Sequence, residues 1–399
     1  MPGQKQNLLN HIDAVEIAKR QDVNDLRAFV LKNPLKLSRE ILQLVANQIT
    51  FNQIISHKIP AWAKYSEIIA PEKVSLEQSS SEWTAKYKSD YVSGKLGADL
   101  TGGLGVDAFF LSQKFERYIH NEPNGNLSEI VAFNFKKMGK ENISFTQLPA
   151  EEFPITDAID FLYLDPSRRD LNNRKMVGIQ DCSPDLSTMI EDMVAPNRTI
   201  MVKYSPMLDI KAGIMLLKYV HQVLILSEKN EVKELVFIIR NSKIEFPEIK
   251  CVNLKSNGTT QEFSFDFSKE TNAAVSYSEP KAYIYEPNAA IMKAGAFKSV
   301  SAYFGLEKIA ANSHLYTSEK IVNLFPGRTF LVSKVLAYDK KNLVAENLTG
   351  KANIAVRNFP FSAEEIKKQL KWQDGGENYL FFTENSFKKK IVIFCKKIQ

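Results

Sequence analysis

The sequence predicts an α/β protein with three parts: a helical N-terminal region, a central domain on a mainly parallel sheet, and a C-terminal α/β module. Two observations support this division. From Gly94 onward, short apolar runs alternate with helical stretches, whereas few β-branched runs precede it. The length of 399 residues also exceeds what one ordinary domain needs. We expect domain boundaries at residues 1–90, 91–242, 243–282 and 283–399, the third being a strand-rich connecting segment.

The N-terminal region is predicted to be helical. Ser38 is a plausible N-cap, because apolar side chains recur behind it at helical spacing, at Ile41, Leu42, Val45 and Ile49. Asp22 or Asn24 is expected to start an earlier helix, which Pro34 would end.

The central domain is predicted to contain seven strands, at residues 96–100, 118–121, 143–147, 160–164, 199–203, 221–226 and 234–240. Helices are expected between them, for example at 127–138 and 185–193. Strands separated by helices imply a parallel sheet covered on both faces. Only the short turn 227–230 joins the last two strands, so the final strand is antiparallel. Seven strands with one reversed near the end is the Rossmann-like architecture of class I methyltransferases.

The composition is that of an average soluble globular protein, with 44% hydrophobic and 25% charged residues. The net charge of +6 permits a nucleic-acid partner without requiring one. Cys182, Cys251 and Cys395 form no CxxC pair and the five histidines are scattered, so we expect neither a metal site nor a disulfide framework. There is no signal-peptide pattern and no apolar run near the roughly 18 residues of a membrane span, so a cytoplasmic location without a membrane partner is expected.

A glycine-rich turn, residues 99–105 (DLTGGLG), follows the first strand and precedes a helix. Ligands of open α/β sheets bind at the carboxyl ends of such strands. Gly103 and Gly105 let the backbone approach a ligand closely, and Asp99 can accept a hydrogen bond from an ammonium group. No third glycine follows, and Asp107 stands where a pyrophosphate would bind, so the turn favours a cofactor without phosphate.

Two further segments are candidates for the same cofactor. Glu122 ends the second strand some twenty positions beyond the glycine turn, where a carboxylate would bind a ribose diol. Residues 82–88 (EWTAKYK), which end in Lys88, precede the first strand. This segment either folds over the methionine end of the cofactor or is a surface amphipathic helix.

The apolar run 161–164 ends abruptly in Asp165 and Pro166, at the mouth of the fourth strand. Pro166 fixes the next turn, and Asp165 is placed to hold the nucleophilic atom of a substrate or to accept its proton. A methyl transfer by in-line displacement needs mainly positioning, so one fixed acceptor is sufficient. Asp165 and Pro166 are therefore predicted to lie at the catalytic site.

The residues around this strand end leave alternatives open. Arg168 and Arg169 either bind a phosphate or carboxylate of the substrate or pair with Asp170 or Asp181. The run 203–206 (KYSP) ends the next strand and either contacts the substrate or fixes Asp165. Cys182 has no supporting base and is predicted to be structural. Ser183 or Asp181 is expected to cap the helix that begins near residue 185.

The motifs GADLTGGLGVD, NEP and YLDPSRRD resemble those of bacterial class I methyltransferases that carry a C-terminal THUMP-like domain and are common among Bacteroidetes. The segments YIYEPNAAIMKAGAF, LFPGRTF, VRNFPFSAEEIKKQLK and GGENYLFF resemble that domain, so the resemblance covers most of the chain. It implies a C-terminal α+β THUMP-like domain and a catalytic strand end at Asp165 and Pro166, to which we add Arg168. The cofactor implied is S-adenosyl-L-methionine, with predicted ligands Asp99, Thr101, Gly103, Gly105, Asp107, Glu122 and Lys88.

Within the C-terminal module we expect helices at 288–294 and 364–370 and strands at 330–337, 353–357, 379–382 and 391–395. True THUMP domains belong to tRNA-modifying enzymes, so ribosomal or transfer RNA is the predicted substrate. Lysines at 388–390 and 396–397 flank an apolar strand and either track phosphates or form a solvated tail. Methylation of a protein or small molecule, or a non-catalytic RNA-binding role, are the alternative functions.

One departure from related enzymes concerns base recognition. Methyltransferases acting on amino groups of bases usually place a proline and an aromatic residue after Asp-Pro, so that the base stacks on the ring. Here Ser167 and Arg168 occupy those positions. Stacking would then have to come from elsewhere, and Tyr163 and Tyr204 are the candidates.

Overall fold

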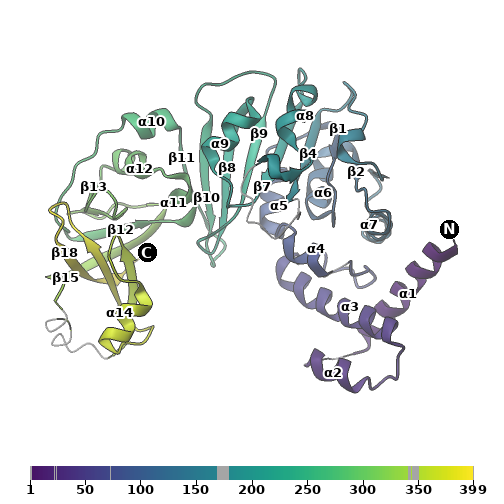
Figure 1. The fold of residues 1–399 in the computed structure, drawn as a ribbon, viewed down its shortest axis with the longest axis horizontal. Helices are drawn as coiled ribbons and strands as arrows, with labels where there is room; N and C mark the ends of the chain where they lie inside the picture. Colours follow the sequence, from purple (N-terminus) through teal and green to yellow (C-terminus); the bar gives the residue numbers. More distant parts are fainter. Residues whose placement is uncertain are drawn as a thin grey trace. The chain divides into compact units, whose positions relative to one another are not determined.

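The computed structural model describes residues 2–21, 23, 25–71, 73–168, 179–339, 343 and 350–398. It divides into two compact units (Figure 1). The first comprises Met1–Val220 and Phe237–Lys243, and the second comprises His221–Val236 and Ile244–Gln399. No described helix is long and apolar enough to cross a membrane.

The first unit begins with three helices, α1 (Pro2–Lys19), α2 (Leu26–Lys32) and α3 (Arg39–Lys58). Ser38 caps α3 as predicted, since its hydroxyl accepts a hydrogen bond from the Ile41 amide at 3.3 Å. The helices share a small apolar core that includes Ala14, Phe29, Val45 and Ile49. Asp25 caps α2 and Asn33 ends it, one residue before Pro34. The predicted caps Asp22 and Asn24 lie outside the described residues.

Two short helices, α4 (Lys73–Gln78) and α5 (Glu82–Ser89), lead into the sheet. Its strands in this unit are β1 (Gly94–Asp99), β2 (Phe115–Asn121), β3 (Ile143–Thr146), β4 (Phe161–Leu164) and β7 (Thr199–Tyr204). β1 pairs in parallel with β2 on one side and with β4 on the other. The chain therefore reverses its order of strands at β1, and such switch points in open α/β sheets form ligand-binding crevices.

The helices between these strands are α6 (Val106–Leu111), α7 (Gly125–Lys137), α8 (Leu186–Met193) and α9 (Ile210–Leu217). The predicted cap of α8 is wrong. Asp185 is the N-cap, and its carboxylate accepts a hydrogen bond from the Ser187 amide at 3.0 Å. Ser183 lies instead in a two-residue strand, β6 (Cys182–Ser183), which pairs with β5 (Ser167–Arg168).

All seven predicted strands are present, and two more join the same sheet. Its order is β11-β10-β8-β9-β7-β4-β1-β2-β3. Lys229 and Asn230, both with positive φ, form the two-residue turn between β8 (Val220–Glu228) and β9 (Glu231–Ile239). The segment predicted as a connection supplies β10 (Glu248–Leu254), parallel to β8, and β11 (Thr260–Phe265), antiparallel to β10.

The second unit also holds a seven-stranded sheet of order β13-β14-β12-β15-β18-β17-β16. Its strands are β12 (Tyr283–Pro287), β13 (Glu307–Lys308), β14 (Tyr316–Ser318), β15 (Gly327–Ala337), β16 (Asn353–Arg357), β17 (Asn378–Glu384) and β18 (Lys390–Lys397). The helices are α10 (Phe267–Asn272), α11 (Ala289–Ala294), α12 (Phe297–Phe304) and α14 (Ala363–Leu370). Ile366 and Leu370 of α14 pack into one apolar core of this sheet, with Phe382 and Val392.

Candidate cofactor-binding site

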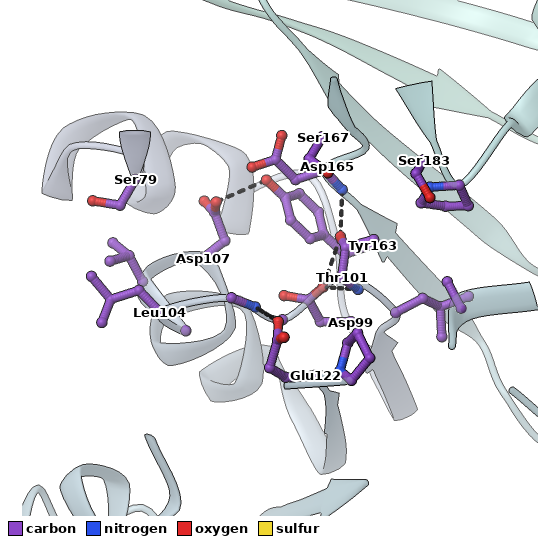
Figure 2. A pocket seen from close by; sticks show the side chains of 18 of the residues that line it. Ser79, Asp99, Thr101, Leu104, Asp107, Glu122, Tyr163, Asp165, Ser167 and Ser183 are labelled. Carbon is purple, nitrogen blue, oxygen red and sulfur yellow. Dashed lines mark hydrogen bonds between the residues drawn. The ribbon is translucent and has the colours of Figure 1, made fainter. Parts of the chain in front are cut away.

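A pocket of about 410 Å³ lies at the carboxyl ends of β1 and β4 in the first unit (Figure 2). That volume is within the range of roughly 300–1,000 Å³ that small-molecule sites have. The turns that follow four parallel strands line it, together with a stretch before the sheet. The lining residues are 78–80, 99–107, 122–123, 149–151, Tyr163, Asp165, Ser167, Ser183 and Pro184.

Glycine is required at two positions of this turn, for a different reason at each. Gly103 has φ +51, and a Cβ placed there would meet nothing closer than the Thr101 carbonyl oxygen at 3.7 Å. Its surroundings are open on the side of the pocket, so a ligand can approach the backbone there. Gly105 has φ +81, but a Cβ at that position would lie 2.9 Å from the Phe135 ring. At Gly105 the requirement comes from packing against α7 as well as from the backbone angle.

Asp99 lies at the end of β1 and is 1% exposed. Its carboxylate accepts a hydrogen bond from the Thr101 amide at 3.0 Å. Burial raises the pKa of Asp99 well above its ordinary value, and the charges of Asp107, Asp165 and Glu122 raise it further, although the hydrogen bond from Thr101 opposes them. A positively charged ligand would relieve both effects, so Asp99 is suited to bind a cation.

Glu122 follows β2 and is held at the rim of the pocket. Its Oε2 accepts a hydrogen bond from the Gly103 amide at 2.8 Å, and its Oε1 accepts one from the Asn124 amide at 2.9 Å. The carboxylate is therefore fixed against the glycine turn (Figure 2). Each carboxylate oxygen has two lone pairs, so both retain capacity to accept a hydrogen bond from a ligand hydroxyl.

Asp107 is the centre of a buried network behind the pocket. Its Oδ2 accepts hydrogen bonds from the hydroxyls of Ser80 and Tyr163, both at 2.8 Å, and its Oδ1 lies 2.8 Å from the Lys88 ammonium. Burial alone would raise the pKa of Asp107, but the charge of Lys88 holds it below the ordinary value. Lys88 is fully buried and does not line the pocket, so it acts on the site through its contacts with the lining residues Asp107 and Ser80.

Asp165 is anchored from two sides. Its amide donates a hydrogen bond to the Thr101 hydroxyl at 2.6 Å, and its carboxylate lies 2.6 Å from the Lys203 ammonium. The Asp165 side chain is 39% exposed, whereas that of Lys203 is 10% exposed. Of the two roles left open for the end of the next strand, the structure supports the one in which Lys203 fixes Asp165.

The remaining predicted site residues are placed less completely. Pro166 is buried beside Asp165. Arg168 is described through its backbone, which pairs with Cys182, and its side chain lies outside the description, as do Arg169 and Asp170. Tyr163 and Tyr204 are 1% and 4% exposed. Neither ring presents an exposed face to a base, contrary to the prediction.

Several lining residues were not predicted from the sequence to belong to the site. Ser80 is one of them, because it precedes the sheet by more than a dozen residues and has no strand end beside it. The others are its neighbours Gln78 and Ser79, the turn 149–151 after β3, and the pair Ser183 and Pro184. Turns after parallel strands converge on one edge of the sheet. The predicted third strand could therefore have indicated the turn 149–151, but not the other residues.

The pocket is acidic. Asp99, Asp107, Glu122, Glu151 and Asp165 line it, and no lysine or arginine is among its described lining residues. Both lysines of the site lie behind these carboxylates, paired with Asp107 and Asp165. Such a pocket favours a ligand with positive charge and disfavours a pyrophosphate.

Comparison with known proteins gives matches over the C-terminal part and over the whole chain. A ferredoxin-like domain model matches residues 283–326, and a THUMP domain-like model matches residues 327–397. A crystal structure from Porphyromonas gingivalis W83, described as a candidate methyltransferase, is 31% identical in sequence, with a TM-score of 0.86. The match covers 97% of this chain and 98% of that one. The chain belongs to the bacterial class I methyltransferase family with a C-terminal THUMP-like domain. This confirms the resemblance and the fold class predicted from the sequence.

Two other matched structures are much more distant from this chain in sequence. A modification subunit of a type I restriction enzyme from Vibrio vulnificus YJ016 is 10% identical over 50% of this chain and 56% of that chain, with a TM-score of 0.34. A tRNA (m1A58) methyltransferase from Aquifex aeolicus is 12% identical over 34% and 49%, with a TM-score of 0.25. TM-scores this low give no information about the substrate. No curated protein matches the chain.

In this family member, a buried carboxylate joins the ferredoxin-like and THUMP-like parts. Glu286 of β12 is 2% exposed. It accepts hydrogen bonds from Arg328 Nε at 2.7 Å and from Arg357 Nη2 at 2.6 Å. A buried carboxylate needs such partners, since an unpaired charge in the interior is costly. The two matched segments therefore form one folded module.

Proposed function

We propose that this protein is an S-adenosylmethionine-dependent methyltransferase that acts on ribosomal or transfer RNA in the cytoplasm. The acidic pocket beside the glycine turn is the observation that supports the cofactor. S-adenosylmethionine carries a sulfonium, an ammonium and a carboxylate group and no phosphate, so its net positive charge complements the five carboxylates of the lining. A dinucleotide would bring a pyrophosphate into the same acidic surroundings.

The residues of the pocket fit the parts of this cofactor. Asp99 would accept a hydrogen bond from the ammonium group, and Glu122 would accept hydrogen bonds from the ribose hydroxyls. The open backbone at Gly103 would lie against the cofactor, and Asp107 would be a further acceptor whose position Lys88 maintains. When bound, the cofactor would supply a methyl group on a sulfonium centre that is activated for transfer.

Asp165 is the proposed catalytic residue. Its carboxylate is the half-exposed acceptor at the pocket wall, and Lys203 and Thr101 fix its position. It would hold the acceptor group of the substrate by a hydrogen bond and take up its proton. Pro166 would fix the turn, and Arg168 would bind a phosphate of the substrate. Positioning of this kind is the main requirement of an in-line displacement.

The RNA substrate is supported by three features of the chain. Residues 327–397 match a THUMP domain-like model, and true THUMP domains occur in tRNA-modifying enzymes. The net charge is +6. Exposed lysines follow one another at Lys388, Lys389 and Lys390. Basic surface residues of this kind contribute affinity for nucleic acid through phosphate contacts.

Two measurements test the proposal. Calorimetry should show binding of S-adenosylmethionine or S-adenosylhomocysteine in the micromolar range, about 8 kcal/mol, and no binding of NAD. Mass spectrometry of RNA nucleosides from a deletion strain should show the loss of one methylated nucleoside that the wild-type gene restores. Tight NAD binding would refute the cofactor assignment. An unchanged set of methylated nucleosides, with cofactor binding intact, would point to a protein or small-molecule acceptor.

A further inference from the structure

The turn between β17 and β18, together with the first residue of β18, presents an aromatic ring and three positive charges to solvent at residues 386–390 (SFKKK). We call these five residues the hairpin tip; β18 lies near the yellow end of the colour bar in Figure 1. All five are exposed, and the Phe387 side chain is 72% exposed. A single exposed apolar residue is common and needs no explanation. What distinguishes this tip is its rigidity and its unpaired charge.

Asn385 fixes the conformation of the tip from below. It is 4% exposed, and its Oδ1 accepts hydrogen bonds from the amides of Phe387 at 3.1 Å and Lys389 at 2.8 Å. Its Nδ2 donates to Glu279 Oε1 at 2.7 Å. Two backbone bonds between Asn385 and residues 388 and 389 close the turn. Because the backbone is already ordered, Phe387 can bind a partner at little conformational cost.

The three lysines of the tip have no acidic partner among the described residues. Within the described parts of the chain, Lys388, Lys389 and Lys390 form no ion pair. Glu384 is the strand partner of Lys390, yet no ion pair joins the two side chains in that part of the structure. By contrast, Lys367 pairs with Asp374 and Lys281 with Glu307 in the same unit. Among the residues that the structure describes, nothing compensates the charge of the tip, which lies next to an exposed ring.

We propose that the hairpin tip binds an unpaired stretch of the RNA substrate, with Phe387 stacked on a base and the three lysines in contact with flanking phosphates. This inference rests on the proposed function. Unpaired RNA is recognised by stacking of splayed bases on aromatic side chains, and lysines contribute sequence-independent phosphate contacts. An acidic peptide would use the charges and leave the ring without a partner. One ring beside three lysines is also too small an apolar surface for stable membrane binding.

Two further lysines of the same strand, Lys396 and Lys397, do not belong to this site. Lys396 and Lys397 lie at the other end of β18, and seven residue steps along a strand separate Lys390 from Lys397 by about 23 Å. The two lysine groups that flank the strand were considered together in the prediction from sequence, as residues that either track phosphates or form a solvated tail. The structure separates the two groups, so Lys396 and Lys397 serve as a matched control for charge.

The test measures binding of the full-length protein to a labelled tRNA transcript by fluorescence anisotropy over a range of salt concentrations. Phe387→Ala should weaken binding by about 5- to 100-fold, the scale of one lost base–aromatic stack. Phe387→Leu should be equally weak although it keeps an apolar side chain, and Phe387→Trp should retain the affinity. Replacing Lys388, Lys389 and Lys390 with Gln should reduce the log–log salt slope by about 2, at roughly 0.7 for each phosphate contact.

Two control variants test whether the effects are specific to the hairpin tip. Lys396→Gln with Lys397→Gln removes charge elsewhere, and Leu324→Ala removes another exposed apolar side chain, which is 90% exposed. Both should bind RNA like the wild type. If the tip variants also bind like the wild type, the inference is overturned, while a methyl mark missing from the deletion strain would leave the proposed function standing. A wild-type protein that binds cofactor but no RNA at low salt would overturn both the inference and the RNA assignment.

Discussion

Replacing Lys88 with Met tests the network that supports the pocket. The change removes a buried cation and keeps most of the side-chain volume. In the wild type the Lys88 ammonium lies 2.8 Å from Asp107 Oδ1 and 2.9 Å from the Ser80 hydroxyl. The variant leaves the Asp107 carboxylate buried, with the hydroxyls of Ser80 and Tyr163 and the charge of Lys203 to stabilise it. Breaking a buried ion pair on one side costs about 3–5 kcal/mol of unfolding free energy.

The loss should depend on pH. In the wild type, Lys88 holds the pKa of Asp107 below its ordinary value, so the pair stabilises the fold above the unfolded-state pKa and this contribution is lost as pH falls through the lowered folded-state pKa. In the variant, burial without the cation should raise the pKa of Asp107. The folded state then binds the proton more tightly than the unfolded state. The loss of stability in the variant should therefore be largest at neutral pH and should shrink as pH falls to about 4, the ordinary pKa of an aspartate, and below it.

Urea unfolding in a Trp372→Phe background measures this effect in one unit. The chain has three tryptophans, and without Trp372 the fluorescence comes from Trp62 and Trp83, both in the first unit. Lys86→Met is the matched control on the same helix, because Lys86 pairs with Glu82 while its side chain is 56% exposed. Such a surface pair contributes no more than about 1 kcal/mol.

A double variant identifies the cause. Lys88→Met combined with Asp107→Asn removes both charges and keeps an acceptor for Ser80 and Tyr163, so most of the lost stability should return. A loss from Lys88→Met below about 1 kcal/mol, or one that does not change with pH, would refute the reasoning. So would a double variant that is no more stable than the single one.

Three further substitutions test the pocket. Asp99→Asn should weaken S-adenosylhomocysteine binding by about tenfold to a hundredfold; because the pKa of Asp99 is raised, wild-type affinity should tighten as pH rises toward that pKa, and calorimetry on the variant should show no such trend. Gly103→Ala should lower the unfolding free energy by about 1–2 kcal/mol through backbone strain alone, whereas Gly105→Ala should lower it by about 2–5 kcal/mol, because it adds about 1–3 kcal/mol of overpacking against Phe135 to the same strain; equal losses in urea unfolding would contradict this. Asp165→Asn should slow methyl transfer by about a hundredfold or more and change cofactor affinity only a few-fold, and a wild-type rate would exclude a catalytic role.

Local patterns were sufficient for the central features of the fold. Apolar runs of four to eight residues bounded by turns marked the seven strands of the central sheet, and Ser38 marked the start of α3. They were insufficient where several groups compete for one role. Asp181, Ser183 and Asp185 are all good N-cap residues, and only the backbone path shows that Asp185 occupies the position. Similarly, the polar segment after β9 carried strand signals, but its pairing with β8 is a long-range choice.

Sequence patterns were sufficient to bring Asp99, Glu122 and Asp165 together, because each stands at or directly after the end of a predicted parallel strand, and such ends share one edge of the sheet. The balance of their charges, by contrast, became known from the folded structure. Lys88 meets Asp107 across the chain, Lys203 meets Asp165, and neither pair follows from spacing along a helix or strand. Ion pairs between distant segments depend on side-chain packing, which no local periodicity encodes.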